Sequence, residues 1–248
     1  MRRHLAFGLA FGAFVFVVFG AAPAAAQSGR VVLAVNGFQQ SGMDTLSTTT
    51  AFAANAENGS ITTTFPLKTG TGFDGSITVR VRGVFGISLG GTSFKTSGSA
   101  DVAAKVPHPF FFNQPRSIAG TVGMNREETT ARLALALSSA PGGRFQFTAY
   151  AGPAYVTVKQ DLVDSVSYTD SYPYDTATFT RANTSQPSKT AVGFAAGIDA
   201  AFFPTKSIGL GLSASMVGAT INVTGTDNAT IRIKAGGTQL GGGLRIRF

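Results

Sequence analysis

After about residue 30, several segments of the chain alternate apolar residues with small or polar ones at every second position. The last five residues show this most clearly, because Leu244, Ile246 and Phe248 are separated by two arginines. Successive side chains of a β-strand point to opposite faces, so this spacing predicts strands with one apolar face. Eight segments carry the pattern: residues 31–36, 77–82, 85–90, 132–138, 145–150, 192–202, 208–216 and 244–248.

The faces opposite the apolar ones hold mostly Gly, Ala, Ser and Thr, with isolated charges. A soluble β-sandwich buries its large apolar residues and covers its outside with polar side chains. A narrow membrane barrel does the reverse, because its outside meets lipid and its lumen is crowded and polar. The pattern favours the barrel. The sandwich stays open as an alternative, since alternation alone does not show which face meets water.

The connections between these segments alternate between short and long. The short ones are residues 83–84, 140–144 and 204–207, and the long ones are about 41–71, 98–126, 159–188 and 223–235. Outer-membrane barrels have short periplasmic turns and longer extracellular loops, and an even number of strands returns the C-terminus to the periplasm. We therefore predict an all-β fold, an eight-stranded antiparallel up-and-down transmembrane β-barrel with four external loops.

The first long connection contains a hairpin signal of its own. Residues 46–52 and 61–65 flank Asn58 and Gly59, a residue pair typical of tight hairpin turns. Two extra strands standing above the membrane rim are one interpretation. A ten-stranded barrel is the competing one.

The N-terminus predicts export. Two arginines near the start precede an uncharged stretch over residues 5–19, and small residues up to Ala26 follow it. These are the parts of a secretory signal peptide, and the stretch is short for a membrane span of about 20 residues. We predict a signal peptide over residues 1–26 and a barrel domain over residues 27–248. A retained N-terminal anchor is the alternative.

Composition excludes several other classes of protein. The chain has no cysteine, so neither a disulfide framework nor a thiolate metal site is expected. Only 13% of residues are charged, yet no apolar run after residue 26 approaches the length of a membrane helix. The isoelectric point is about 10.1, but no basic run exists, and export separates the chain from nucleic acid. We expect the surplus lysines and arginines to face phosphorylated lipid of the outer leaflet.

Three segments resemble strands of the small bacterial outer-membrane barrels that include OmpA-type membrane domains. They are residues 150–155, 193–203 and 241–248, and the last of them ends in Phe248, like the closing strand of such barrels. The resemblance covers about residues 30–248 and implies a location in the bacterial outer membrane, surrounded by lipid and lipopolysaccharide. It also implies that the barrel-assembly machinery recognises the terminal strand, with Phe248 as the assembly signal. A monomer is expected.

Charged residues at lumen-facing positions form the first candidate site. By alternation they are Asp74, Arg80, Arg82, Glu128, Arg132, Asp199, Arg245 and Arg247. The lumen of an eight-stranded barrel is just wide enough for side chains to fill, and buried charges must be paired and hydrogen-bonded. A salt-bridge network that plugs the lumen is one interpretation. The other is a narrow ion path, which would favour anions because the arginines outnumber the acids.

The second and third long loops supply the remaining candidates. His108 is the single histidine after residue 26, and it stands among three prolines without a visible catalytic partner. Aromatic side chains interleaved with polar groups suit recognition. The candidate contact surface of these loops consists of His108, Phe110, Phe111, Phe112, Tyr168, Tyr172 and Tyr174. No cofactor and no metal site is predicted.

These observations predict a structural or surface-binding protein that acts through its extracellular loops and is not an enzyme. Two alternatives stay open. One is a narrow porin-like channel for small or hydrophobic solutes, which planar-bilayer conductance would reveal. The other is an enzyme that modifies lipid A, with His108 joined to Asp101 or to a serine.

Overall fold

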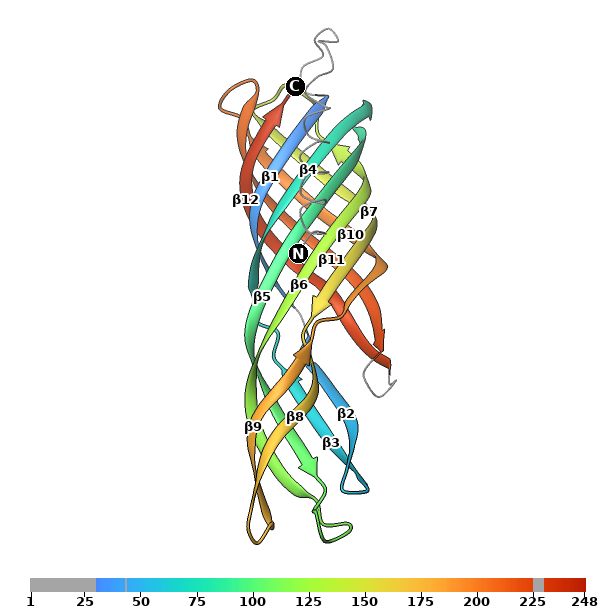
Figure 1. Ribbon diagram of the computed structural model, residues 1–248. Helices are drawn as coiled ribbons and strands as arrows, with labels where there is room; N and C mark the ends of the chain where they lie inside the picture. The colour runs from blue at the N-terminus through green and yellow to red at the C-terminus, as the bar shows by residue number, and fades with distance from the viewer. Residues whose placement is uncertain (1–29, 43, 225–229) are drawn as a thin grey trace, which may run out of the picture.

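The computed structural model describes residues 30–42, 44–224 and 230–248, so the predicted signal peptide lies outside the described residues. Eight of the strands in these segments form one closed ring, in which every strand pairs with its two neighbours (Figure 1). The ring strands are β1 (Val31–Ser41), β4 (Gly70–Arg82), β5 (Phe85–Val106), β6 (Arg116–Ser138), β7 (Phe145–Gln160), β10 (Ser188–Phe202), β11 (Ile208–Thr224) and β12 (Thr230–Arg247). In the part of the chain that is described, no helix has the length and apolar character needed to cross a membrane.

All pairings in the ring are antiparallel, and the first and last strands close it. Leu33 of β1 lies opposite Ile246 of β12, and Val35 lies opposite Leu244. A closed ring leaves no unpaired strand edge, which is the condition for a sheet to span lipid. The predicted eight-stranded antiparallel barrel is confirmed, and the soluble sandwich is wrong.

Large apolar side chains point outward from the ring near its short turns. Leu135 and Leu212 are 76% and 73% exposed, whereas Ala134 and Ala136, which flank Leu135 in β6, are buried in the lumen. The alternation of the sequence therefore corresponds to large residues outside and small residues inside. Lipid covers such an outer band in a transmembrane barrel.

Along β5 the apolar residues change from the outer face to the inner one. Ile87 and Leu89 are exposed on the outer face, whereas Val102 and Val106, farther along the same strand, are buried on the inner face. β5 and β6 have 22 and 23 residues, about twice the 9–11 that a membrane strand needs. Their distal halves therefore stand beyond the membrane, with polar residues turned to water.

This extension differs from the long loop that was predicted over residues 98–126. Most of that segment is regular strand, and only residues 107–115, between β5 and β6, form the connection. The prediction was wrong because small residues occur on both faces. Ala103 and Ala119 point outward, and Ala100 and Ala104 point inward, so the alternation is weak. The inner face is nevertheless buried or half-buried along its length.

Two further hairpins stand beside the extended β5–β6 hairpin, at the end of the barrel opposite the short turns (Figure 1). The first consists of β2 (Leu46–Ala54) and β3 (Glu57–Phe65), and the second of β8 (Leu162–Ser171) and β9 (Thr176–Ser185). β3 pairs with the distal half of β5, and β9 packs against β6. We call the three hairpins together the extracellular hairpin assembly.

The β2–β3 hairpin contributes no strand to the ring, so the ten-stranded alternative is wrong. Its turn also differs from the predicted position. The turn residues are Asn55 and Ala56, both with left-handed backbone, whereas Asn58 and Gly59 lie inside β3. Gly59 is needed there for another reason, because a Cβ at this position would lie 2.4 Å from the ring of Phe52.

Two apolar clusters fill the interior. The first occupies the lumen where the hairpins join the barrel and contains Phe65, Met124, Ile221 and Ile233. The second lies within the hairpin assembly and consists of Ile61, Val102, Ala104, Val106, Ile118 and Val163. The hairpin assembly therefore has a hydrophobic core of its own.

Candidate functional site

The middle of the lumen is crossed by two ion pairs that share one asparagine. Arg132 of β6 lies 2.6 Å from Asp74 of β4, and Arg245 of β12 pairs with Asp199 of β10. Asn36 of β1 joins them, since its side-chain nitrogen donates to Asp74 at 3.1 Å and its oxygen accepts from Arg245 at 2.7 Å. Five strands are thereby tied together across the lumen.

Glycines on the lumen wall make room for the two guanidinium groups. A Cβ at Gly90 would lie 2.6 Å from the guanidinium carbon of Arg132, and one at Gly211 would lie 2.7 Å from that of Arg245. The guanidinium of Arg132 also lies 4.9 Å from the ring centre of Tyr150. Each arginine therefore lies flat against the wall, within reach of its carboxylate.

A second polar layer lies closer to the hairpin end and centres on Glu128. Its carboxylate accepts hydrogen bonds from Arg126 at 2.7 Å, from Gln40 at 3.1 Å and from the backbone nitrogen of Gly236 at 3.0 Å. Arg126 also donates to the carbonyl of Lys234 at 2.6 Å. Arg126 and Glu128 are both buried. The sequence prediction missed Arg126, although it occupies the same face of β6 as Glu128 and Arg132.

The remaining three predicted lumen charges lie near the short turns. Arg80 donates to the carbonyl of Ser139 at 2.5 Å, and Arg247 donates to those of Gly143 and Lys206, both at 3.0 Å.

Arg82 differs from the other predicted lumen charges because it is exposed. The pairing register between β4 and β5 shifts between Arg80 and Arg82, so that Arg82 lies opposite Phe85, a residue of the outer surface. Residues directly opposite one another in a ladder share a face. A bulge adds one residue to a strand and reverses its alternation, which is why the prediction for Arg82 was wrong.

At the distal end of the hairpin assembly, Arg116 joins the β5–β6 connection to the β8–β9 turn. Its guanidinium is buried and lies 2.5 Å from the carboxylate of Asp170. It also donates to the carbonyl of Tyr174 at 3.1 Å and to that of Pro107 at 3.2 Å. The ring centre of Tyr168 lies 5.9 Å from the same guanidinium.

His108 organises the β5–β6 connection itself. It is buried, and its Nδ1 accepts hydrogen bonds from the backbone nitrogens of Phe110 and Phe111, both at 3.1 Å. Its Nε2 lies 3.7 Å from a carboxylate oxygen of Asp175. Because Nδ1 is an acceptor, the proton of a neutral ring is on Nε2. The acidic neighbour of His108 is thus Asp175, whereas the sequence analysis had suggested Asp101.

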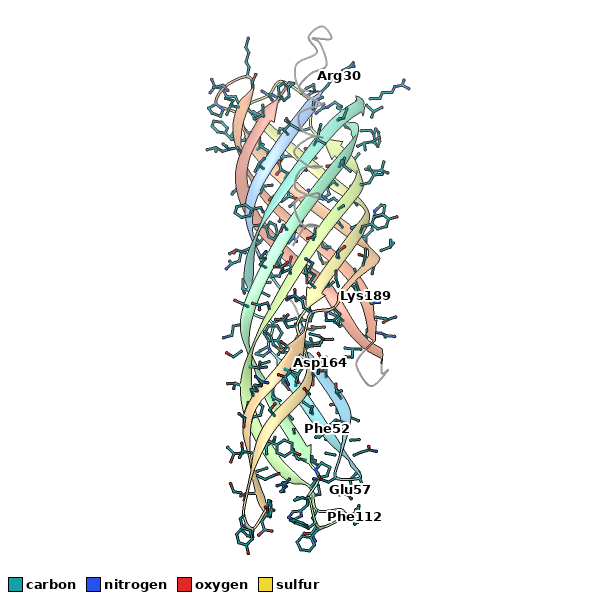
Figure 2. All side chains as sticks on the ribbon, in the orientation of Figure 1. Arg30, Phe52, Glu57, Phe112, Asp164 and Lys189 are labelled. Atoms are coloured by element: carbon teal, nitrogen blue, oxygen red, sulfur yellow. The ribbon has the colours of Figure 1, made fainter. Side chains whose placement is uncertain are left out.

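The β2–β3 turn is attached to the same connection. Asn55 donates to the carbonyl of Pro107 at 3.1 Å, and Glu57 accepts from the backbone nitrogen of Asn113 at 2.8 Å. All three hairpin turns therefore meet at one place, where Figure 2 labels Glu57 and Phe112.

Four aromatic side chains project into solvent from this meeting point. Phe110, Phe112 and Tyr172 are 67%, 69% and 88% exposed, and Phe111 is exposed as well. Phe110 contacts Tyr174 edge-on, with ring centres 5.3 Å apart, and Tyr174 contacts Tyr172 in the same way at 6.0 Å. We call the four exposed residues Phe110, Phe111, Phe112 and Tyr172 the aromatic tip.

The structure thus brings most of the predicted loop contacts together, and it adds residues that sequence reasoning missed. Arg116 and Asp170 are 54 positions apart and carried no local signal. The predicted assembly signal, Phe248, lies beside β1, where its backbone nitrogen donates a hydrogen bond to the carbonyl oxygen of Val31 at 2.9 Å. In the described segments no group of three or more His, Asp or Glu residues could hold a metal ion.

No protein-family model matches this sequence, and the search of curated proteins finds no match. Solved outer-membrane proteins resemble the fold. OprG from Pseudomonas aeruginosa has 11% identity and a TM-score of 0.47, over 89% of this chain and 96% of that one. Neisserial surface protein A has 9% identity and a TM-score of 0.43, over 90% and 100%. The attachment invasion locus protein Ail of Yersinia pestis, in complex with a heparin analogue, has 12% identity and a TM-score of 0.42, over 88% and 99%. At these identities and TM-scores the likenesses assign no function to the chain.

Proposed function

We propose that this outer-membrane β-barrel is a surface-binding protein with a closed lumen, and that the aromatic tip is its binding site. The observation that carries the proposal is that buried hydrogen bonds fix the turns from which the exposed apolar rings project. Arg116 and His108 are buried beneath the tip and hold the turns by hydrogen bonds, while the rings themselves face solvent.

The exposure of these rings is energetically unfavourable in water. Burial of one large apolar side chain is worth about 1.5–3 kcal/mol, so four rings gathered at one place favour contact with an apolar surface. A mobile loop would lose ordering entropy on binding, whereas turns already fixed by buried hydrogen bonds lose little. The proposed partner is an apolar surface outside the cell.

The lumen supports a binding role over the channel alternative. Two layers of mutually bonded polar side chains, buried or half-buried, and one apolar cluster follow one another along it. A conducting path for ions or solutes would need these side chains to separate. We expect no stable single-channel steps from the purified protein in planar bilayers, and regular steps would favour the channel.

The experiment that tests the binding proposal measures the partition of cells into hexadecane droplets. Cells that display the wild-type protein should adhere several-fold more than cells without it. The combined substitution Phe110→Ser, Phe112→Ser and Tyr172→Ser should remove the difference, because it removes most of the exposed apolar area at the tip.

A matched control replaces three exposed residues on the side wall of the same hairpins: Lys105→Ser, Ala119→Ser and Thr121→Ser. This variant should adhere like the wild type. If the tip variant also adheres like the wild type, or if both variants lose adhesion equally, the aromatic tip is not the binding site.

An enzymatic role in lipid A modification stays the third candidate. His108 is buried, and its Nδ1 is occupied by two backbone donors, which leaves it poorly placed to accept a substrate proton. We expect an unchanged lipid A profile in cells that carry His108→Ala. A profile that changes would favour the enzyme.

A further inference from the structure

The end of the barrel with the short turns carries the whole surplus of positive charge that follows residue 26. We define this periplasmic rim as residues 30–33, 78–87, 136–147, 200–209 and 246–248. It contains no aspartate or glutamate, and its basic residues are Arg30, Arg80, Arg82, Arg144, Lys206 and Arg247. Of the chain's 20 basic residues, two precede the predicted cleavage site and six lie in this rim, so twelve lie elsewhere and are matched by the 12 acidic residues.

This distribution differs from the one expected from the sequence, in which the surplus charge faced the outer leaflet. The extracellular side has many basic residues, but acidic residues balance them, as in the pairs Lys95–Glu127 and Lys234–Asp44, both at 2.7 Å. The imbalance lies at the opposite end of the molecule, where Figure 2 labels Arg30.

The inner arginines of the rim bind backbone carbonyls in place of carboxylates. The bonds of Arg80 and Arg247 described above all go to carbonyls of the periplasmic turns, and Arg247 lies 4.1 Å from the ring centre of Phe203. Such bonds hold a guanidinium in place but leave its charge uncompensated.

Exposed aromatic residues place the outer cations of the rim at the level of lipid headgroups. Phe85 lies opposite Arg82 in the β4–β5 ladder, and Phe145 follows Arg144 in the chain. Phe145 contacts Phe202 on the neighbouring strand, with ring centres 5.0 Å apart. Girdles of aromatic residues mark the membrane interfaces of transmembrane barrels, and long basic side chains reach from there to the headgroups.

We propose that the periplasmic rim binds anionic phospholipid in the periplasmic leaflet of the outer membrane. The exposed cations Arg30, Arg82, Arg144 and Lys206 would contact the phosphate groups, and the phenylalanines would contact the acyl chains. Each Lys or Arg near an anionic membrane surface strengthens binding by about five-fold. A belt of four such cations therefore selects anionic over zwitterionic lipid and fixes the depth of the barrel. This proposal is independent of the aromatic tip.

The test compares the lipids that remain bound to the full-length protein. Wild type and variants are reconstituted in nanodiscs of phosphatidylcholine with phosphatidylglycerol as the minor component, and released complexes are analysed by native mass spectrometry. The rim variant carries Arg30→Gln, Arg82→Gln, Arg144→Gln and Lys206→Gln. The control removes the same number of exposed charges from the extracellular side, by Lys105→Gln, Arg181→Gln, Lys189→Gln and Arg232→Gln.

Wild type and control should retain phosphatidylglycerol in preference to phosphatidylcholine, and the rim variant should lose about ten-fold or more of this preference. Raising the salt concentration should weaken the preference of the wild type, because counterions screen exposed charges. The heat-induced shift in gel mobility verifies that all three proteins are folded. No preference in the wild type, or an equal loss in rim and control variants, would overturn the proposal. Displacement of the bound lipid by free glycerophosphoglycerol would also overturn the proposal, because the rim would then bind the headgroup alone, without a membrane.

Discussion

β5 and β6 run through both the membrane-spanning barrel and the extracellular hairpin assembly, and they use opposite faces in the two regions. In the barrel their large apolar residues point outward, as Leu135 does, and the lumen holds small and charged residues. In the hairpin assembly Val102 and Ile118 point inward and polar residues face outward. The backbone pairing is continuous across the change. The solvent around a strand decides which of its faces is apolar. Where lipid surrounds the strand, the outer face is apolar, and where water surrounds it, the inner face is apolar.

The two regions also hold themselves together differently. The middle of the barrel depends on buried ion pairs that span the lumen, whereas the hairpin assembly combines an apolar core with one buried arginine at its tip. The following variants should separate the two modes of stabilisation, in order of decreasing expected effect.

Asp199→Ala should have the largest effect, because it leaves the fully buried guanidinium of Arg245 without its carboxylate. Removal of one partner from a buried pair costs about 3–5 kcal/mol. We expect this loss in the free energy of unfolding, measured by urea titration in lipid vesicles. Extracellular protease resistance of the folded protein should be unchanged, since the hairpin assembly has its own core. A loss below about 1 kcal/mol, the range of exposed pairs, would show that the lumen is hydrated.

Ile118→Ala should destabilise the hairpin assembly alone. Replacement of a buried isoleucine by alanine costs about 2–5 kcal/mol, and Ile118 belongs to the hairpin core, outside the membrane. Hydrogen exchange should accelerate in the distal halves of β5 and β6, while the heat-induced gel shift of the barrel stays at the same temperature. A lower shift temperature would mean that the two regions unfold as one unit.

Leu135→Arg should test the lipid-facing assignment of the barrel. An arginine on the lipid face near the middle of the membrane costs about 2–4 kcal/mol. Ala119→Arg is the matched change, because Ala119 is exposed on the same face of β6 in the hairpin assembly and should face water. It should change the stability by less than about 0.5 kcal/mol. Equal effects of the two substitutions in vesicles would contradict the proposed membrane boundary.

Asp170→Asn should have the smallest effect. The Asp170 carboxylate is partly exposed, and Arg116 keeps its bonds to backbone carbonyls after the substitution. Ion pairs with an exposed partner contribute about 1 kcal/mol or less. We expect faster hydrogen exchange only near the tip. Exchange that accelerates throughout β8 and β9 would show that this pair holds the whole hairpin.

Much of the barrel could be predicted from the sequence because alternation is a local property. Each predicted segment lies within one ring strand, except that Phe248 follows the end of β12, and the short turns were placed to within one residue. The predicted lumen position of Arg82 was wrong because a single bulge reverses the alternation that follows it. The distal halves of β5 and β6 were not predicted as strands, because alanines and glycines there make the alternation weak.

The candidate site was predictable only in part. His108 and the three phenylalanines after it were visible as an unusual local run. The buried contacts that hold them were not, because Arg116 meets Asp170 from another hairpin, and Glu57 reaches Asn113 from a third. Nothing in the residues near Arg116 indicates that partner.

Two properties could be predicted from the amino-acid sequence: the alternating faces of the ring strands and the absence of acidic residues from the segments of the periplasmic rim. These properties follow from residue spacing and chain order alone. Only the folded structure shows that the ring has eight strands and not ten, that the second long connection continues as strand, that Asn36 links two ion pairs and that three turns meet at one aromatic tip. Those outcomes depend on contacts between residues far apart in the chain, which exist only after the ring has closed and fixed the register of every strand.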